Sequence, residues 1–240
     1  MKFDLNITNS QIVFSYSRNM EIRKRVFEFE NVLKEQFNTP FRTVAIPDEL
    51  DPNIPRFESQ SKHGHSRIQV AQTRMTLATS FNKKLTKTEA YNYLNEKRLL
   101  LTDLANSEKI DFIAYVIELN CYLPEESINS ILIENTGVKA LDKNCRDFTL
   151  LYSRVYKNDF YLNVKCSKFS EQELILESGA KELKHTNNIK HGISITLDLN
   201  SKVFYEKNKK FEHSLYKQIE NHVFNLIQKK SLQDYLKGNI

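Results

Sequence analysis

The first residues of the chain alternate between apolar and polar side chains. The apolar positions are Phe3, Leu5, Ile7, Ile12, Phe14 and Tyr16. A period of two places successive side chains on opposite faces of an extended chain, so this stretch predicts β-strand. Asn9 and Ser10 separate the two apolar runs, and they predict a turn or a bulge at that point.

The period changes to that of a helix after Asn19. One helical stripe collects the apolar residues Ile22, Val26, Phe29, Leu33 and Phe37. Charged residues occupy the remaining faces between them. This pattern predicts a long amphipathic helix over residues 22–37.

Four of the five prolines lie between positions 40 and 55. Because proline fixes φ and has no N–H to donate, no helix or central strand can continue through this stretch. We expect a short strand at Thr43–Ile46 and an extended loop at Pro47–Pro55. Strands then follow at Phe57–Ser61 and Arg67–Phe81, with a turn or bulge near Gln72, where the parity of the apolar positions changes.

Three further helices have recognisable ends. Thr86 followed by Glu89 forms a capping box, which predicts a helix that continues to about Ala105. Pro124 is suited to the first turn of a short helix, and Gly137 is suited to its end. The clearest apolar stripe of the chain predicts a final long helix over residues 215–227. A short segment, Ser231–Leu236, follows it and ends at Gly238.

The remaining strands are predicted in the second half of the chain. Ile110–Leu119 is apolar on both faces, as expected of a strand at the centre of a sheet. Phe148–Val155 and Tyr161–Cys166 alternate on either side of residues 157–159, which predicts a hairpin. Ile193–Leu199 also alternates regularly.

The predicted order β-α-β-β-β-α therefore occurs twice, once over residues 1–107 and once over residues 108–240. The tripeptide Lys-His-Gly recurs at 62–64 and 190–192, and we expect each copy just before a strand. This order predicts an α+β fold in which two similar halves form one integrated domain. We expect a pseudo-two-fold arrangement, with a largely antiparallel curved sheet and helices packed on one face.

One stretch resembles a known group of proteins. It contains Pro55–Ser59, then His63-Gly64, then the strand Arg67–Leu77, then a helix with Tyr91 and Leu94. This succession resembles a bacterial protein family of sporadic distribution without an established function. The family also opens with a strand and a helix and finishes with a strand before a terminal helix. The resemblance implies the fold but no catalytic residue, and this chain lacks the tryptophan that is common in the family.

Composition excludes several classes of protein. The 240 residues are 40% hydrophobic and 27% charged, which is ordinary for a globular chain. No run approaches the ~18 apolar residues of a membrane helix, and the N-terminus lacks the apolar core of a secretory signal. Three cysteines without a CxxC pair do not form a disulfide framework. We therefore expect a cytoplasmic protein that does not act in a membrane.

Histidines offer the first candidate site. His63 and His65 would share one face of a strand, and His191 or Asp198 could complete a metal site with them. The alternative is a polar turn in which Gly64 supplies a positive φ. Since no HExxH or similar cluster of ligands supports a metal, we expect no resident cofactor.

Carboxylates offer a second candidate site. Asp198 on its strand, with Glu118 or His63 nearby and Lys202 close in sequence, could hold Mg²⁺ for phosphodiester hydrolysis. The alternative is that these polar residues occupy the solvated face of a sheet. A cysteine nucleophile is a weaker candidate, because Cys121, Cys145 and Cys166 lie in no catalytic signature.

Basic residues indicate a third kind of site. The net charge is +5 with a pI near 8.9, which is mildly basic. The lysines that could contact phosphates are Lys83, Lys84, Lys87, Lys190, Lys202, Lys207, Lys209 and Lys210. The aromatic residues that could stack on bases near the predicted hairpin are Tyr152, Tyr156, Phe160 and Tyr161. The alternative is a solvated surface with the aromatic residues in the core.

No phosphate-binding loop is present, and the chain has only five glycines from which to build one. We therefore expect a non-catalytic protein that binds a macromolecule, either protein or nucleic acid, through an exposed sheet face. A second copy of the chain is also a candidate partner. The alternatives are a metal-dependent nuclease or phosphodiesterase, and a small-molecule pocket between the sheet and the helix at 215–227.

Overall fold

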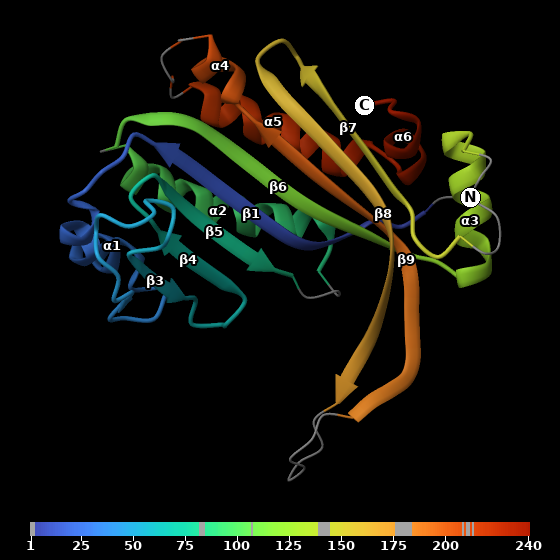
Figure 1. Ribbon diagram of the computed structural model, residues 1–240, viewed down its shortest axis with the longest axis horizontal. Coiled ribbons are helices and arrows are strands. Elements are labelled where there is room, and N and C mark those ends of the chain that lie inside the picture. Colours follow the sequence, from blue (N-terminus) through green and yellow to red (C-terminus); the bar gives the residue numbers. More distant parts are fainter. Residues whose placement is uncertain are drawn as a thin grey trace.

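The computed structural model describes residues 3–81, 85–106, 108–138, 145–175, 184–207, 209, 212 and 214–240, with the backbone alone at 173–175 and 184–188. Nine strands form one antiparallel sheet in the order β2-β3-β4-β5-β1-β6-β9-β8-β7. Figure 1 shows helices α2 and α5 along one face of this sheet. The expected α+β class and antiparallel sheet are confirmed.

The strands are β1 (Asn6–Tyr16), β2 (Arg42–Thr43), β3 (Phe57–Gln60), β4 (Ser66–Val70), β5 (Arg74–Ser80), β6 (Ile110–Tyr122), β7 (Thr149–Tyr156), β8 (Phe160–Ile175) and β9 (Lys184–Asn200). The helices in the described part of the chain are the 3₁₀ turn η1 (Ile22–Arg25), α1 (Val26–Leu33), α2 (Lys87–Ala105), α3 (Glu125–Thr136), α4 (Lys202–Glu206), α5 (Ser214–Lys229) and α6 (Leu232–Lys237).

The N-terminal alternation forms one strand rather than two. β1 continues through Asn9 and Ser10, and its pairing with β6 shifts register between Ile7 and Asn9. The bulge alternative is therefore the correct one. Ile12 and Phe14 are buried on the face that α2 and α5 cover, as the period of two predicted.

The first helix is shorter than the predicted span of 22–37. Residues 22–25 form a 3₁₀ turn, and α1 ends at Leu33. Phe37 is still buried, but it forms an isolated bridge with Ser61 at the edge of the sheet. The strand predicted at Thr43–Ile46 is also shorter, because only Arg42 and Thr43 pair with β3.

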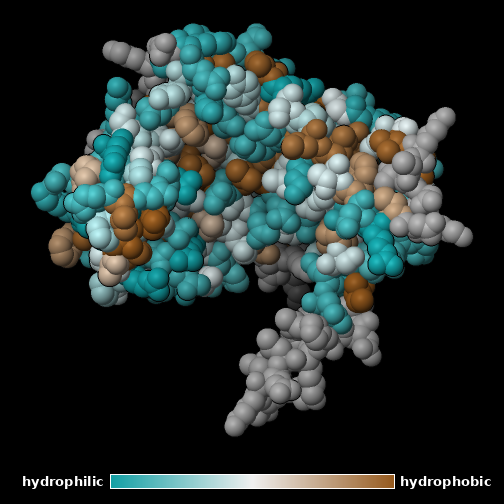
Figure 2. All heavy atoms as spheres, in the orientation of Figure 1, coloured by the Kyte–Doolittle hydropathy of each residue, from teal (hydrophilic) through white to brown (hydrophobic). Residues whose placement is uncertain are grey.

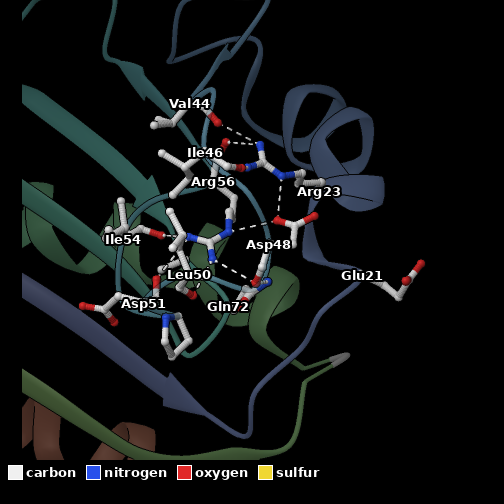
Figure 3. Close-up of polar contacts among 12 residues, drawn as sticks. Glu21, Arg23, Val44, Ile46, Asp48, Leu50, Asp51, Ile54, Arg56 and Gln72 are labelled. Carbon is white, nitrogen blue, oxygen red and sulfur yellow. Dashed lines mark hydrogen bonds and ion pairs between the residues drawn. The ribbon is translucent and has the colours of Figure 1, made fainter.

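Two arginines hold the proline-rich segment 44–56, which we call the strap (Figure 3). The side chain of Arg56 is fully buried, and its Nε donates to Asp48 Oδ1 at 3.0 Å. Its other nitrogens donate, at 2.6 to 3.4 Å, to the carbonyl oxygens of Asp48, Leu50, Asp51 and Ile54. These carbonyl oxygens of the strap therefore accept hydrogen bonds from a guanidinium group rather than from a neighbouring strand.

Arg23 extends the same network from η1. It donates to Asp48 Oδ1 at 2.8 Å and to the carbonyl oxygens of Val44 and Ile46 at 3.0 and 2.6 Å. The hydrogen bond from Arg23, with a second from Arg56, holds the pKa of Asp48 below its usual range. One carboxylate thus joins η1 to both ends of this network, in the strap and at the residue that precedes β3.

A buried ion pair joins the two long helices behind the sheet. Arg98 on α2 contacts Glu220 on α5 at 3.0 Å, and both side chains are largely buried. Neither charge could remain in the core without the other. The pair therefore restricts how α2 and α5 pack side by side.

Strands β8 and β9 are much longer than predicted. The sequence indicated residues 161–166 and 193–199, whereas residues 168–175 and 184–191 continue the ladder beyond the last pairs with β6 and β7. We call these two segments the arm. Figure 1 shows that the arm projects away from the rest of the sheet.

Gly192 lies where the arm leaves the sheet. A Cβ atom at this position would be 2.2 Å from the carbonyl oxygen of Cys121 and 2.6 Å from the ring of Phe169. The Phe169 and Tyr122 rings pack edge to face at 5.5 Å beside it. Only glycine fits this position without displacing the strands.

The Lys-His-Gly copies therefore have different settings. Gly64 has a positive φ of 74° in the turn between β3 and β4, as predicted. Residues 190–192 lie inside β9, so their predicted place before a strand is wrong. The repeated tripeptide gives no support to two matching halves.

Removal of the Arg56 guanidinium should destabilise the fold. We expect Arg56→Met to lower the free energy of unfolding by about 2–4 kcal/mol, because several buried acceptors lose their donor. Arg56→Lys should recover little of this stability, because an ammonium group lacks the planar set of N–H donors of a guanidinium. Urea denaturation followed by circular dichroism measures both. The control Arg42→Met removes an ion-pairing side chain that is 76% exposed and should cost less than ~1 kcal/mol. An equal loss in both variants would contradict the role of Arg56.

The glycine at the root of the arm gives a second prediction. Gly192→Ala should lower the free energy of unfolding by about 2–3 kcal/mol, because the added methyl group meets a backbone carbonyl that cannot move alone. Thr196→Ala, on the same face of β9, is the control and should cost less than ~1 kcal/mol. Thermal and urea denaturation provide the measurements. A neutral Gly192→Ala substitution would show that the backbone there has room.

Candidate functional site

The proposed metal ligands do not come together. His63 and His65 are exposed in the turn between β3 and β4, whereas His191 and Asp198 belong to β9. β5, β1 and β6 separate β4 from β9, which corresponds to roughly 19 Å at about 4.8 Å per strand. The described residues contain no group of three or more histidine, cysteine, aspartate or glutamate side chains placed to hold a metal ion.

Two carboxylates do share one face. We call the side of the sheet opposite α2 and α5 the open face. Asp198 lies opposite Val116 and Glu118 lies opposite Thr196, so the two carboxylates are diagonal neighbours on adjacent strands. Asn9 Nδ2 donates to Glu118 Oε2 at 3.0 Å, and Asn163 Nδ2 donates to Asp198 Oδ2 at 2.9 Å. Each carboxylate thus accepts a hydrogen bond from a neutral amide side chain.

The other members of the nuclease hypothesis lie elsewhere. Lys202 pairs with Glu206 within α4, with the two charged atoms 3.7 Å apart. His63 lies in the turn described above, on the far side of β5, β1 and β6. The hypothesis therefore retains Glu118 and Asp198 without the lysine or histidine that it invoked.

A shallow hollow opens on the open face where β1, β5, β6 and β9 meet. Its volume is about 250 Å³, and its lining includes Gln11, Ala78, Val116, Glu118 and Thr196. Apolar side chains alternate here with neutral hydrogen-bonding groups and one carboxylate. Such a mixture suits the side chains of another protein better than it suits a phosphate.

A larger hollow of about 1140 Å³ lies between α3, residues 145–147, β8 and β9. Along its wall, Ser170 Oγ contacts His191 Nδ1 at 2.9 Å, and His191 Nε2 lies 3.4 Å from Glu125 Oε2. This succession is reminiscent of the relay in serine hydrolases, where the carboxylate is buried. Glu125 is instead 74% exposed. We therefore interpret these contacts as a link between α3 and the arm.

Lys168 makes a second link across the same hollow. Its Nζ donates to Asn129 Oδ1 at 2.9 Å and to the carbonyl oxygen of Cys145 at 2.8 Å.

Glu125 and Ser170 were not singled out from the sequence. The described side chains of the arm, at 168–172 and 189–191, are all at least partly exposed, and they show no apolar period that would have predicted a strand.

The lysines of the predicted basic site are spread over several elements. Lys83, Lys84 and Lys210 lie outside the described residues. Lys87 donates to the carbonyl oxygen of Ile227 on α5, and Lys190 lies in the arm. The others surround α4, where Lys202 pairs with Glu206, Lys207 donates to the carbonyl oxygen of Asn158 and Lys209 lies over the ring of Phe204. The described lysines therefore form no single stripe.

The predicted stacking residues are divided in the same way. Phe160 is buried in the core, and Tyr152 donates to the carbonyl oxygen of Tyr235 on the helix side. Tyr161 donates to Glu206 at 2.6 Å. His222 on α5 packs between the rings of Tyr156 and Phe160, and burial lowers its pKa.

The helix proposed to cover a small-molecule pocket packs directly on the sheet. The apolar residues of α5 are buried in the core, namely Leu215, Ile219, Val223, Leu226 and Ile227. The two hollows described above are lined by other elements. The apolar side chains of α5 therefore belong to the core, which counts against the pocket hypothesis.

The cysteines differ in their surroundings. Cys121 and Cys166 are buried, and burial raises their pKa values to about 11 and about 12. Cys145 is half-buried, and its Sγ donates to the carbonyl oxygen of Asp147 at 3.1 Å. The surroundings of Cys121 and Cys166 therefore oppose formation of a thiolate.

This contrast predicts how the thiols react. In the native protein near pH 8, we expect Ellman's reagent to modify one thiol per chain quickly, at Cys145, and all three after denaturation. The variant Cys145→Ser should show no fast phase. A fast phase that persists in this variant would mean that Cys121 or Cys166 is accessible.

No helix in the described part of the chain is long and apolar enough to cross a membrane. No protein-family model and no curated protein sequence matches the chain.

Proposed function

We propose that this chain is a non-catalytic binding protein that engages a protein partner through the open face of its sheet. The observation that carries the proposal is the one-sided cover of the sheet: α2 and α5 lie on one face, and the opposite face presents half-exposed side chains over β1, β5, β6 and β9. Figure 2 shows hydrophobic and hydrophilic side chains interspersed on this side of the molecule.

The chemistry of the open face favours a protein over a nucleic acid. Val13, Ala78, Val116 and Thr196 are half-buried there, and they offer contact area without strong charge. Glu118 and Asp198 add negative charge at the centre, which would oppose phosphate groups. Of the lysines predicted to contact phosphates, those that the structure describes lie around α4, at the start of α2 and in the arm, as set out above.

The same proposal includes the relationship between the two halves. Residues 1–107 and 108–240 each supply a strand to the centre of the sheet, β1 and β6, and each flanks it with its own last strand, β5 or β9. This order supports a pair of related βαβββα units within one integrated domain. The strap belongs to the first unit alone, and the arm belongs to the second.

A charge placed on the open face tests the binding proposal. We expect Val116→Arg, combined with Thr196→Arg, to reduce capture of the native partner at least tenfold, because two buried cations would face an apolar contact. The tagged full chain is purified from its native host, and captured proteins are quantified by mass spectrometry. Binding of the identified partner is then measured by calorimetry.

The control is Leu99→Arg on α2, where the side chain is 53% exposed away from the open face. It should leave capture unchanged. Retention of the partner by the doubly substituted open-face variant would contradict the proposal. Capture of nucleic acid that nuclease treatment removes would also contradict it, and would favour the alternative partner.

A further inference from the structure

The two edges of the sheet are unlike each other. At one edge, β2 is two residues long. At the other edge, β7 has eight residues, contains no proline, glycine or lysine, and pairs with β8 without a bulge. Proteins usually protect long edges with such features, because unpaired backbone groups invite another strand.

The direction of the backbone groups of β7 follows from its pairing. The N–H of Lys168 donates to the carbonyl oxygen of Phe148 at 3.1 Å, in continuation of the β7–β8 ladder. Because antiparallel residues point their N–H and C=O to alternate sides, the even-numbered residues of β7 bond to β8. The odd-numbered residues point theirs outward, and these are Thr149, Leu151, Ser153 and Val155.

The outward positions are also the exposed ones. All four are exposed, and Leu151 and Val155 retain 67% and 54% of their accessible surface. Within the described residues, no hydrogen bond outside the sheet ladder reaches their backbone groups. Figure 2 shows hydrophobic side chains on this side of the molecule over β7 and its neighbours.

We propose that two copies of this chain pair through β7, antiparallel, around a two-fold axis at Ser153. In this register Leu151 of each copy lies opposite Val155 of the other, and the small Ser153 side chains meet on the axis. Every outward N–H and C=O from Leu151 to Val155 then has a partner, which gives about six backbone hydrogen bonds.

A second copy fits this edge because the pattern of β7 is its own complement. The two exposed apolar residues lie two positions on either side of Ser153, so one rotation matches both pairs. The outward positions carry no charge. The charged residue of β7, Arg154, lies on the helix face, donates to the carbonyl oxygen of Gly238, and comes opposite Tyr152 of the second copy.

Pairing through β7 would place the two open faces side by side in one continuous sheet. The inference does not depend on the proposed partner of the open face, since β7 is the far edge and the hollow lies at the centre. Failure of one proposal therefore leaves the other standing.

The mass of the full chain in solution tests the dimer. Light scattering during gel filtration and sedimentation equilibrium, over about 1–100 µM, should give twice the 28.2 kDa of one chain. Leu151→Lys should weaken the dimer at least tenfold, because it places a charge in the apolar pair. Leu151→Lys combined with Val155→Glu should restore it, because each lysine then lies opposite a glutamate of the second copy.

The control is Phe27→Lys on α1, which removes an exposed apolar side chain (72% exposed) far from β7 and should leave the dimer intact. Recovery in the double variant also shows that Leu151→Lys does not act by unfolding the chain. A monomeric wild-type protein, or a dimer that Leu151→Lys leaves unchanged, would overturn the proposal. A double variant that stays monomeric would overturn the register at Ser153.

Discussion

The antiparallel pairing of β1 with β6 is the constraint on which the rest of the sheet depends. Each of these strands carries a further set of strands on its other edge, which begins with β5 or β9. Ile12 pairs with Tyr115 and Phe14 with Ile113, so the buried side chains of both strands point to the same face. A slip of one residue would turn them all toward solvent. The ion pair of Arg98 and Glu220 joins the two helices packed on that buried face.

Elements that contact the core could be predicted from the sequence. The capping box at Thr86 and Glu89, the helix over 215–227 and the hairpin at 157–159 are all confirmed. In that hairpin, Lys157 and Asn158 adopt positive φ, as a tight turn between right-twisted strands requires. Period and capping report local contacts, and these elements depend on little else.

Elements stabilised by distant groups could not be predicted in this way. The strap carries no periodic signal, because its carbonyl groups bond to Arg23 and Arg56 rather than to a strand. The arm lacks an apolar period, and none of its described side chains, at 168–172 and 189–191, is buried. Phe37 has the spacing of a helix residue, but in the structure it forms an isolated β-bridge with Ser61 at the edge of the sheet.

The candidate sites show the same limit. Glu118 and Asp198 were singled out from the sequence as carboxylates of strands, and both are on the open face. Their separation from His63 depends on strand order, which places two strands between β4 and the β6 strand of Glu118, and three between β4 and the β9 strand of Asp198. Strand order arises from contacts between residues far apart in the chain, so a sequence pattern at one position carries no information about it.

The central place of β1 has a consequence during synthesis on the ribosome. Residues 3–81 contain β1 together with β2, β3, β4 and β5, so this part of the sheet can form early. β6 is translated only after α2, at residues 110–122. Until then the nascent chain exposes the second edge of β1, with its row of unsatisfied amides. That interval is when an unfinished chain would be most prone to pair with its neighbours on a polysome.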